Sequence, residues 1–350
     1  MLSYRPVTSR ALAKVLRRPL NRAAEEIVEI SPPVVRRGRP AVFLPGELER
    51  FTGTHPGSDV KRDHAAARGM DWQHGPSHAY LLRNALIADG CLLTRDSVLA
   101  LNSQKRRWRL PAKMPTIAEG ALCSTQVTER YFGHWLYDGL SHEQWARDRS
   151  LLPLTLCPPE NRTHEPGYRA LADMPAQHVD NVVVDRLWYL EDHELTDDRI
   201  ARVKRIRDRI RSKATGGGPS HVYIGRGVTG VGREIVNERE VADCLQRRGV
   251  VNLEPEKTDP QTIVDTLANA KVVISVEGSA TGHAIIAAPS DAMLVTLFPP
   301  THMNMLFKGY ADALGFGFAI GVGESVSQEQ FRMPTDRLAQ LLDLVSGSPA

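Results

Sequence analysis

The chain has 350 residues, of which 42% are hydrophobic and 24% are charged, a balance typical of globular proteins. Its length predicts two domains, each able to bury a core of its own. The formal net charge of +3 is too small to predict a nucleic-acid partner. The four cysteines form no CxxC pair, and this absence argues against a disulfide scaffold or a structural zinc site and favours a reducing compartment. No uncharged apolar stretch is long enough to span a bilayer.

Residues 1–40 are predicted to form a basic N-terminal tail. The stretch from Met1 to Arg22 lacks acidic residues and the apolar core of a secretory signal, and its cations are Arg5, Arg10, Lys14, Arg17, Arg18 and Arg22. Each such cation gains about 1 kcal/mol near an anionic lipid surface, although a solvated tail is the simpler explanation. We therefore expect a cytoplasmic protein, for which the inner face of the membrane is a peripheral partner at most.

The first half, residues 41–213, is predicted to mix strands and helices in one domain. Apolar runs that alternate with turn residues over 81–101 are typical of a β-meander. A helix over 197–213 has Thr196 as its expected N-cap, and its cations are mixed with acids, which favours a solvated face over a nucleic-acid surface. The other predicted elements are strands at 41–44, 151–156 and 181–190, helices at 131–149 and 168–174, and a loop over 57–75.

Three glycines and a proline at 216–219 form the strongest linker signal, and they place the domain boundary there. Beyond it, strands and helices alternate, which predicts a parallel sheet with helices on both faces. The strands are expected at 221–225, 250–253, 272–276, 293–298 and 316–322, and the helices at 238–248, 260–269, 280–288 and 303–314. The C-terminal domain is assigned to residues 220–325, followed by a helix and tail over 326–350.

The turn Glu277-Gly278-Ser279 ends a buried strand and precedes a helix, so it lies where parallel sheets bind ligands. Gly278 lets a ligand approach the backbone, Ser279 offers a hydroxyl, and free N–H groups with the helix dipole favour a phosphate. Glu277 and, one turn later, His283 are ionisable groups that a purely structural turn does not need. A plain βα turn is the alternative interpretation.

Two arginines are expected at the same edge of the sheet, because Arg226 ends the strand at 221–225 and Arg233 follows a glycine-rich loop. Guanidinium groups bind diphosphate oxygens in bidentate fashion, although a surface loop with solvated arginines has the same sequence. Asn237 is a weaker ligand candidate, since it fits better as the N-cap of the next helix with Glu240 completing a capping box.

His134 and Asp138 are four residues apart in a predicted helix, so they share one face. An imidazole beside a carboxylate is a usable general base near neutral pH, and a structural His–Asp pair is the alternative.

The segment Asp192-His193-Glu194 imitates an acidic metal motif, but no further ligands support it, so no metal site is expected.

Three segments carry further information when they are taken in order: YFGHWLYDGL, VYIGRGVTGVGREIVNERE and AKVVISVEGSATGHAIIAAPSDAMLVTLFPP. Together they resemble glycosyltransferase family 61, which includes capsular-polysaccharide-type transferases. The similarity covers about residues 70–325. Family members often have a second cation at the position of Gly227 and a histidine at the position of Glu277, so this chain differs from them at both places.

The resemblance implies an α/β protein of the GT-B type, with two Rossmann-like domains facing across a cleft. It implies an acceptor in the N-terminal domain, a nucleotide-sugar donor in the C-terminal domain, inversion at the anomeric carbon, and no required metal or cofactor. His134, oriented by Asp138, is then the expected base. The expected donor-binding residues are Arg226, Arg233, Asn237, Glu277, Gly278, Ser279 and His283.

The expected function is hexosyl or pentosyl transfer from a nucleotide-diphosphate donor to a hydroxyl of a glycan or polysaccharide. The first alternative is a non-catalytic nucleotide-binding or polysaccharide-assembly protein on the same fold. A nucleic-acid binder is the second alternative, but few aromatic residues accompany the cations to stack on bases.

Overall fold

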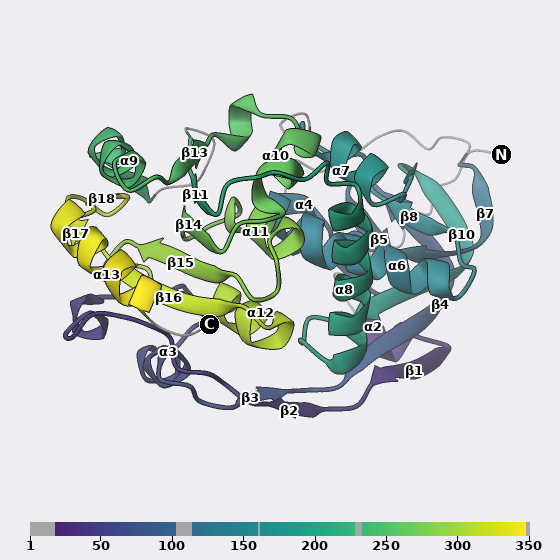
Figure 1. Cartoon of the computed structure of the whole chain (residues 1–350). Coiled ribbons are helices and arrows are strands. Elements are labelled where there is room, and N and C mark those ends of the chain that lie inside the picture. Colours follow the sequence, from purple (N-terminus) through teal and green to yellow (C-terminus); the bar gives the residue numbers. More distant parts are fainter. Residues whose placement is uncertain (1–17, 103–113, 160–161, 228–232, 348–350) are drawn as a thin grey trace. The chain divides into compact units, whose positions relative to one another are not determined.

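The computed structural model describes residues 18–102, 114–159, 162–227 and 233–347 (Figure 1). The chain divides into two compact units, the first built from residues 1–34 and 75–206 and the second from 35–74 and 207–350. This division differs from the predicted domains. Residues 41–74 and 326–350 belong to the second unit, and the boundary falls inside a helix and not at the glycines of 216–219.

The first unit is organised around an eight-stranded mixed sheet in the order β6-β5-β4-β10-β7-β8-β9, with β1 paired to β4. The predicted meander is confirmed, because β4, β5 and β6 are consecutive antiparallel neighbours. Parallel pairing begins at β10 and β7. The strands are β1 (Glu26–Ser31), β4 (Ser77–Ala88), β5 (Cys91–Leu93), β6 (Val98–Ala100), β7 (Thr116–Leu122), β8 (Pro153–Thr155), β9 (Gln177–His178) and β10 (Val182–Glu191).

The predicted helix at 131–149 exists but contains an insertion. It comprises α5 (Phe132–His134), a π-helical turn (Trp135–Gly139) and α6 (Leu140–Asp148). Such turns widen a helix by one residue and often occur at functional sites. The other helices of this unit are α2 (Leu20–Ala23), α4 (Gln126–Arg130), α7 (Glu165–Leu171) and the greater part of α8 (Asp197–Ser212).

The start of α8 corrects one prediction. Thr196 precedes the helix as expected, and its carbonyl accepts the N–H of Ile200. Its hydroxyl, however, is buried without a hydrogen-bond partner among the described residues, so it does not cap the helix.

The second unit contains the predicted parallel sheet. Its five strands lie in the order β13-β11-β14-β15-β16, and all neighbours are parallel. They are β11 (His221–Ile224), β13 (Val251–Leu253), β14 (Val272–Val276), β15 (Met293–Phe298) and β16 (Gly317–Val322). All five residues of β14 are buried, which is why four of them are apolar and only Ser275 is polar.

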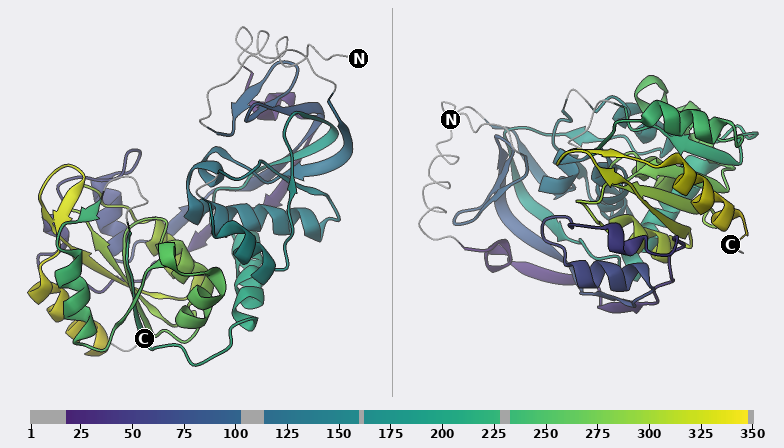
Figure 2. Two further views of the ribbon diagram at one scale, coloured as in Figure 1. Left: turned by 90° about the horizontal axis from the view of Figure 1, so that it is seen from above. Right: turned by 90° about the vertical axis from the view of Figure 1, so that its left-hand side faces the viewer.

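Helices cover both faces of this sheet (Figure 2). They are α9 (Glu238–Gln246), α10 (Pro260–Leu267), α11 (Thr281–Ala287), α12 (Leu306–Leu314) and α13 (Thr335–Gly347). Val241 and Leu245 of α9 and Leu338 and Leu341 of α13 pack into one core with the strands. A smaller sheet joins β12 (Glu234–Ile235), β17 (Glu324–Ser325) and β18 (Gln330–Arg332).

The segment 35–74 completes the second unit and overturns two predictions. The expected loop over 57–75 contains α3 (Val60–Ala67), because Asp59 accepts the N–H of Arg62 and caps the helix. It also contains β3 (Trp72–His74), which pairs with β2 (Val34–Arg36). The expected strand at 41–44 is reduced to a single bridge between Val42 and Ala319 of β16.

Candidate functional site

The arginines and the glycine turn meet at one point of the parallel sheet. In chain order the strands of this sheet are arranged 2-1-3-4-5, so the order reverses between β11 and β14. Arg226 follows β11, and Glu277-Gly278-Ser279 follows β14. In open α/β sheets ligands bind outside the carboxyl ends of the strands at such a reversal. Arg226 and the glycine turn are therefore in the position where the fold favours a ligand.

Both guanidinium groups lie beside Gly278. Nη1 of Arg226 donates to the Glu277 carbonyl at 3.1 Å, and Nη1 of Arg233 forms an ion pair with the Glu277 carboxylate. A methyl group on Gly278 would lie 3.0 Å from Nη1 of Arg226 and 3.9 Å from Nη2 of Arg233. Gly278 also has a φ of +148°, which side-chain-bearing residues rarely adopt. Glycine therefore satisfies both a backbone and a space requirement here.

The charges of this cluster favour an anion. Burial, and next the neighbouring cation Arg233, lower the pKa of Arg226 to about 10, so Arg226 stays protonated near neutral pH while its charge is poorly solvated. An anion between Arg226 and Arg233 relieves both effects. This is the electrostatic condition expected of a phosphate site.

Glu277 acts as a support for this cluster. The residue is 2% exposed, with Oε2 paired to Arg233 and Oε1 accepting from Nδ2 of Asn304 at 2.9 Å. Burial raises its pKa, and the nearby arginines oppose that effect. Since both oxygens are engaged by protein donors, the geometry favours Glu277 as the group that positions Arg233.

Asn304, His302 and His55 are site residues that sequence reasoning missed. Asn304 and His302 lie in the loop after β15, and His55 comes from the segment 35–74. A signal for the first two was present, because β15 neighbours β14 and its carboxyl end must lie beside Glu277. No local pattern marks His55, which reaches this edge through a bridge between Thr54 and Met303.

The remaining predicted donor-binding residues are less exposed to a ligand. Ser279 is half-buried in the turn, and His283 is buried inside α11. Asn237 forms no N-cap hydrogen bond, so the predicted capping box is wrong. Its side-chain amide instead donates to the Met333 carbonyl and accepts from the Met333 N–H, each at 3.0 Å.

The start of α11 offers fewer free N–H groups than expected. The helix α11 has seven residues, and the N–H groups of Thr281, Gly282 and His283 are bonded to carbonyls of residues 278–280. These groups are therefore not available to a phosphate. The glycines expected to fold around the diphosphate, Gly230 and Gly232, lie outside the described residues.

The predicted His–Asp pair is present in the first unit. Nδ1 of His134 lies 2.6 Å from Oδ2 of Asp138, and the side chains are 23% and 9% exposed, respectively. The other carboxylate oxygen of Asp138 pairs with Arg199 of α8, which is 2% exposed. Asp138 thus holds the imidazole at Nδ1, while part of the ring remains accessible to solvent. This is the arrangement expected of an oriented base.

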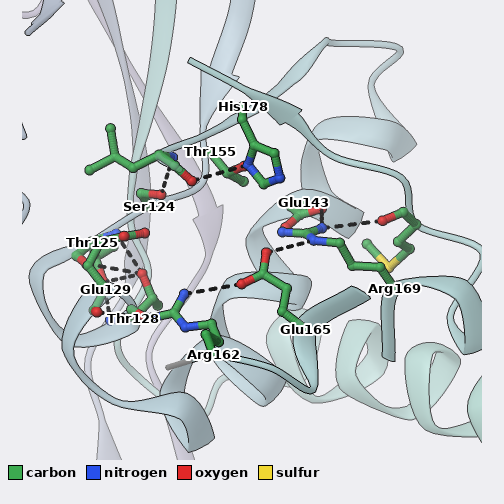
Figure 3. A network of polar contacts seen from close by, with 12 residues as sticks. Ser124, Thr125, Thr128, Glu129, Glu143, Thr155, Arg162, Glu165, Arg169 and His178 are labelled. Atoms are coloured by element: carbon green, nitrogen blue, oxygen red, sulfur yellow. Dashed lines mark hydrogen bonds and ion pairs between the residues drawn. The ribbon is translucent and has the colours of Figure 1, made fainter. Parts of the chain in front are cut away.

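Buried ion pairs hold the helix that carries His134. Arg169 of α7 bonds Glu143 of α6 and Glu165, each at 2.8 Å, and Arg162 lies 3.4 Å from Glu165 (Figure 3). The guanidinium groups of Arg162 and Arg169 lie 5.9 and 5.3 Å from the ring centre of Trp135. Trp135, the residue next to His134, is therefore packed against the buried arginines of this network.

A second buried network joins α6 and α8. Arg202 donates to Asp192 at 2.6 Å and to the Ser141 carbonyl at 2.8 Å. Burial disfavours ionisation of Asp192, but Arg202 and Arg199 outweigh it and lower its pKa to about 2. Asp192, the first residue of the imitated metal motif, is thus a structural ion-pair partner. Among the described residues, no His, Cys, Asp and Glu side chains are grouped in a way that could hold a metal ion.

Stability is predicted to fall in mild acid because of His142. Burial lowers the pKa of this imidazole from 6.5 to about 4. Between these values the unfolded chain binds the proton and the native chain does not, so the free energy of unfolding decreases as the pH falls from 6.5 to 4. The decrease from this group is about 3 kcal/mol. Urea titrations at several pH values measure it.

The matched variants are His142→Gln and, as a control, the exposed His193→Gln. The first should flatten the pH dependence in this window, whereas the second should leave it unchanged. Parallel pH profiles for wild type and His142→Gln would show that His142 is protonated in the native state.

The structure is an α/β protein with two arginines at one edge of a parallel sheet, and the family comparison agrees with a transferase. The family model described as Glycosyltransferase 61 matches residues 132–294. This match confirms the resemblance drawn from the three motifs: over these residues the chain is similar to glycosyltransferase family 61. His134, Arg226, Arg233 and Glu277 all fall inside the match.

The other comparisons add no functional argument. No curated protein matches the sequence. Among solved structures, the metal-soaked Flv1 flavodiiron core of Synechocystis sp. PCC6803 is 12% identical with a TM-score of 0.25, the match covering 82% of this chain and 64% of that one. The flavodiiron protein of Giardia intestinalis is 8% identical with a TM-score of 0.24, covering 77% and 63%. This chain spans less than two thirds of either protein, and TM-scores this low are not evidence for a shared fold.

In the described part of the chain, no helix combines the length and the apolar character that crossing a membrane requires. The basic tail expected to contact lipid lies, up to residue 17, outside the described residues. Of its cations, Arg18 and Arg22 are described: Arg18 pairs with Asp96 at 3.1 Å, and Arg22 lies in α2.

Proposed function

We propose that the protein is an inverting glycosyltransferase that uses a nucleotide-diphosphate sugar. The observation that carries the proposal is the pair of guanidinium groups beside Gly278 at the strand-order reversal of a parallel sheet. A donor diphosphate there would have its charge neutralised by Arg226 and Arg233 without a metal. The match to glycosyltransferase family 61 supports the same class of reaction.

The proposed reaction is a single displacement. An acceptor hydroxyl attacks the anomeric carbon, the bond from that carbon to the diphosphate oxygen breaks, and its electron pair leaves with the diphosphate. His134 takes the hydroxyl proton, with Asp138 holding the ring, which contributes roughly 10²–10⁴-fold. Arg226 and Arg233 offset the charge that grows on the leaving group.

The roles of the two units are part of this proposal. The family resemblance supports a GT-B-like arrangement in which the first unit binds a glycan or polysaccharide acceptor and the second binds the donor. The proposal extends to cytoplasmic capsule-type polysaccharide synthesis, with the basic tail as a peripheral membrane contact. The transferred sugar is a hexose or a pentose.

A ligand screen followed by a transfer assay tests the proposal. Nucleoside diphosphates and nucleotide sugars are screened by thermal shift, since a ligand at about 100 times its Kd stabilises the native state by about 2.7 kcal/mol. The best donor is then incubated with glycan acceptors, and free nucleoside diphosphate is measured. Binding without release for any acceptor would favour a non-catalytic nucleotide-binding protein, and no binding at all would overturn the proposal.

Metal independence is a further prediction. Since the described residues contain no acidic cluster suited to a metal and two arginines can neutralise the diphosphate, transfer should continue in EDTA at an unchanged rate. The assay compares EDTA-treated enzyme with the same enzyme after addition of Mg²⁺ or Mn²⁺. Loss of transfer in EDTA with recovery on metal addition would contradict it.

A further inference from the structure

The loop after β15 carries His302, whose imidazole has an unpaired nitrogen near Glu277, at the carboxyl edge of the parallel sheet. Nε2 of His302 is buried and has no hydrogen-bond partner among the described residues, and it lies 3.7 Å from Oε2 of Glu277. A buried polar atom without a partner is costly unless a ligand completes it. The nearby carboxylate oxygen is already paired with Arg233.

The charges that face His302 come from four segments of this unit. They are Arg226 after β11, Arg233 before β12, Glu277 after β14 and the imidazole of His55. Counting the two arginines and Glu277, the cluster carries one net positive charge when both histidines are neutral. A nucleoside diphosphate carries two to three negative charges, so it leaves an excess of negative charge that a protonated imidazole would balance.

We propose that His302 is a further donor-contacting residue, which donates a hydrogen bond from Nε2 to the diphosphate and binds a proton when the diphosphate binds. This inference rests on the proposed function. Burial and then Arg233, His55 and Arg226 lower the pKa of free His302 to about 4. A diphosphate neutralises the same arginines, so the pKa rises again in the complex and the imidazole becomes a charged donor.

His55 sets the position of His302. The two rings pack edge to face with centres 5.2 Å apart. The His55 N–H donates to the Met303 carbonyl at 2.9 Å, so the chain on either side of the pair is tied together. His55 is itself exposed, so in this pair it is His302 that presents a buried ring nitrogen.

Proton uptake on pyrophosphate binding tests the inference. Inorganic pyrophosphate is titrated by calorimetry into wild type, His302→Asn and Arg226→Ala at pH 6, in two buffers of different ionisation enthalpy. Wild type should take up close to one proton more per ligand than His302→Asn, and its affinity should be about tenfold higher or more. The pyrophosphate's own protonation change is common to all variants and cancels in the difference.

His221→Asn is the matched control, because His221 lies at the opposite, amino end of β11. It should bind pyrophosphate with the affinity and proton uptake of wild type. As a second measurement that needs no variant, the NMR pH titration of the His302 ring in wild type should move to higher pH by about three units when pyrophosphate is added, because a ring with a pKa of about 4 must reach about 7 to be almost fully protonated at pH 6.

The outcomes separate the two proposals. If pyrophosphate binding depends on Arg226 while affinity, proton uptake and the ring titration do not depend on His302, the inference about His302 is overturned and the diphosphate site stands. If wild type and Arg226→Ala bind pyrophosphate equally, or neither binds it at millimolar concentration, the diphosphate site is overturned together with the inference.

Discussion

Replacing Arg226 by alanine is expected to weaken nucleoside diphosphate binding by roughly 1.5–3 kcal/mol, the range for a charge-assisted hydrogen bond, or about ten- to more than a hundredfold in Kd. The guanidinium group is half-buried beside the glycine turn, and this burial lowers its pKa. The N–H of Arg226 is also held by Glu238 at 3.0 Å, so the backbone should keep its course in the variant. Calorimetry with the nucleoside diphosphate selected by the ligand screen measures the change.

Matched variants separate this effect from loss of any positive charge or any glycine. Arg239→Ala removes an exposed arginine from α9 and should leave affinity unchanged. Gly278→Ala should weaken binding as Arg226→Ala does, because the methyl group would displace a guanidinium group. Gly216→Ala shares the cost of a positive φ but would meet no neighbour within 4 Å. Unchanged affinity in Arg226→Ala would remove this arginine from the site.

Replacing His134 by alanine is expected to lower kcat at least about a hundredfold while donor affinity stays nearly constant. The imidazole is partly accessible and is oriented by Asp138 through a 2.6 Å contact, whereas the candidate donor residues belong to the other unit. Asp138→Asn should lower kcat in the same direction but less, since it removes orientation and charge support and leaves the proton acceptor. Turnover and donor affinity are measured on each variant.

The rival explanation, a structural His–Asp pair, predicts lower melting temperatures with normal turnover per folded molecule. Both quantities are therefore measured on the same preparations. The exposed His193→Ala serves as the control for loss of a histidine in the same unit. A His134→Ala variant that melts early but turns over normally would exclude His134 as the base.

The parallel sheet could be predicted because its central strands are short, almost completely buried and mostly apolar runs separated by helices. The predicted bounds of β14 and β15, 272–276 and 293–298, are those of the structure. Their order placed Arg226 and Glu277 at one edge, since the carboxyl ends of parallel strands coincide. The contact between His134 and Asp138 followed in the same way from helical spacing.

The rest depends on contacts between residues far apart in the chain, which no local pattern records. Glu277 was predicted as a ligand residue, but its engagement by Arg233 and Asn304 requires the fold of three separate loops. The π-helical turn after His134 does not alter the apolar spacing enough to be recognised. Likewise, α3 lies in a charged stretch and buries only Asp63, Ala66 and Ala67, so no apolar helical pattern marks it.

The discontinuous second unit has a consequence for synthesis of the chain on the ribosome. Residues 35–74 emerge before the whole of 75–206, yet their partners lie near the C-terminus: Glu47 pairs with Arg337, and Trp72 donates to Asp312 at 2.7 Å. At about 5–20 residues per second, the wait before these partners emerge is on the order of 10–50 s. Leu48 and Trp72 are 0% and 8% exposed in the folded protein. During this wait they lack their native contacts with the segments that have not yet been synthesised. A nascent chain of this kind is a candidate client for chaperones. A fragment that begins at residue 207 would lack Val42 and Leu44, which pack against the core of the second unit.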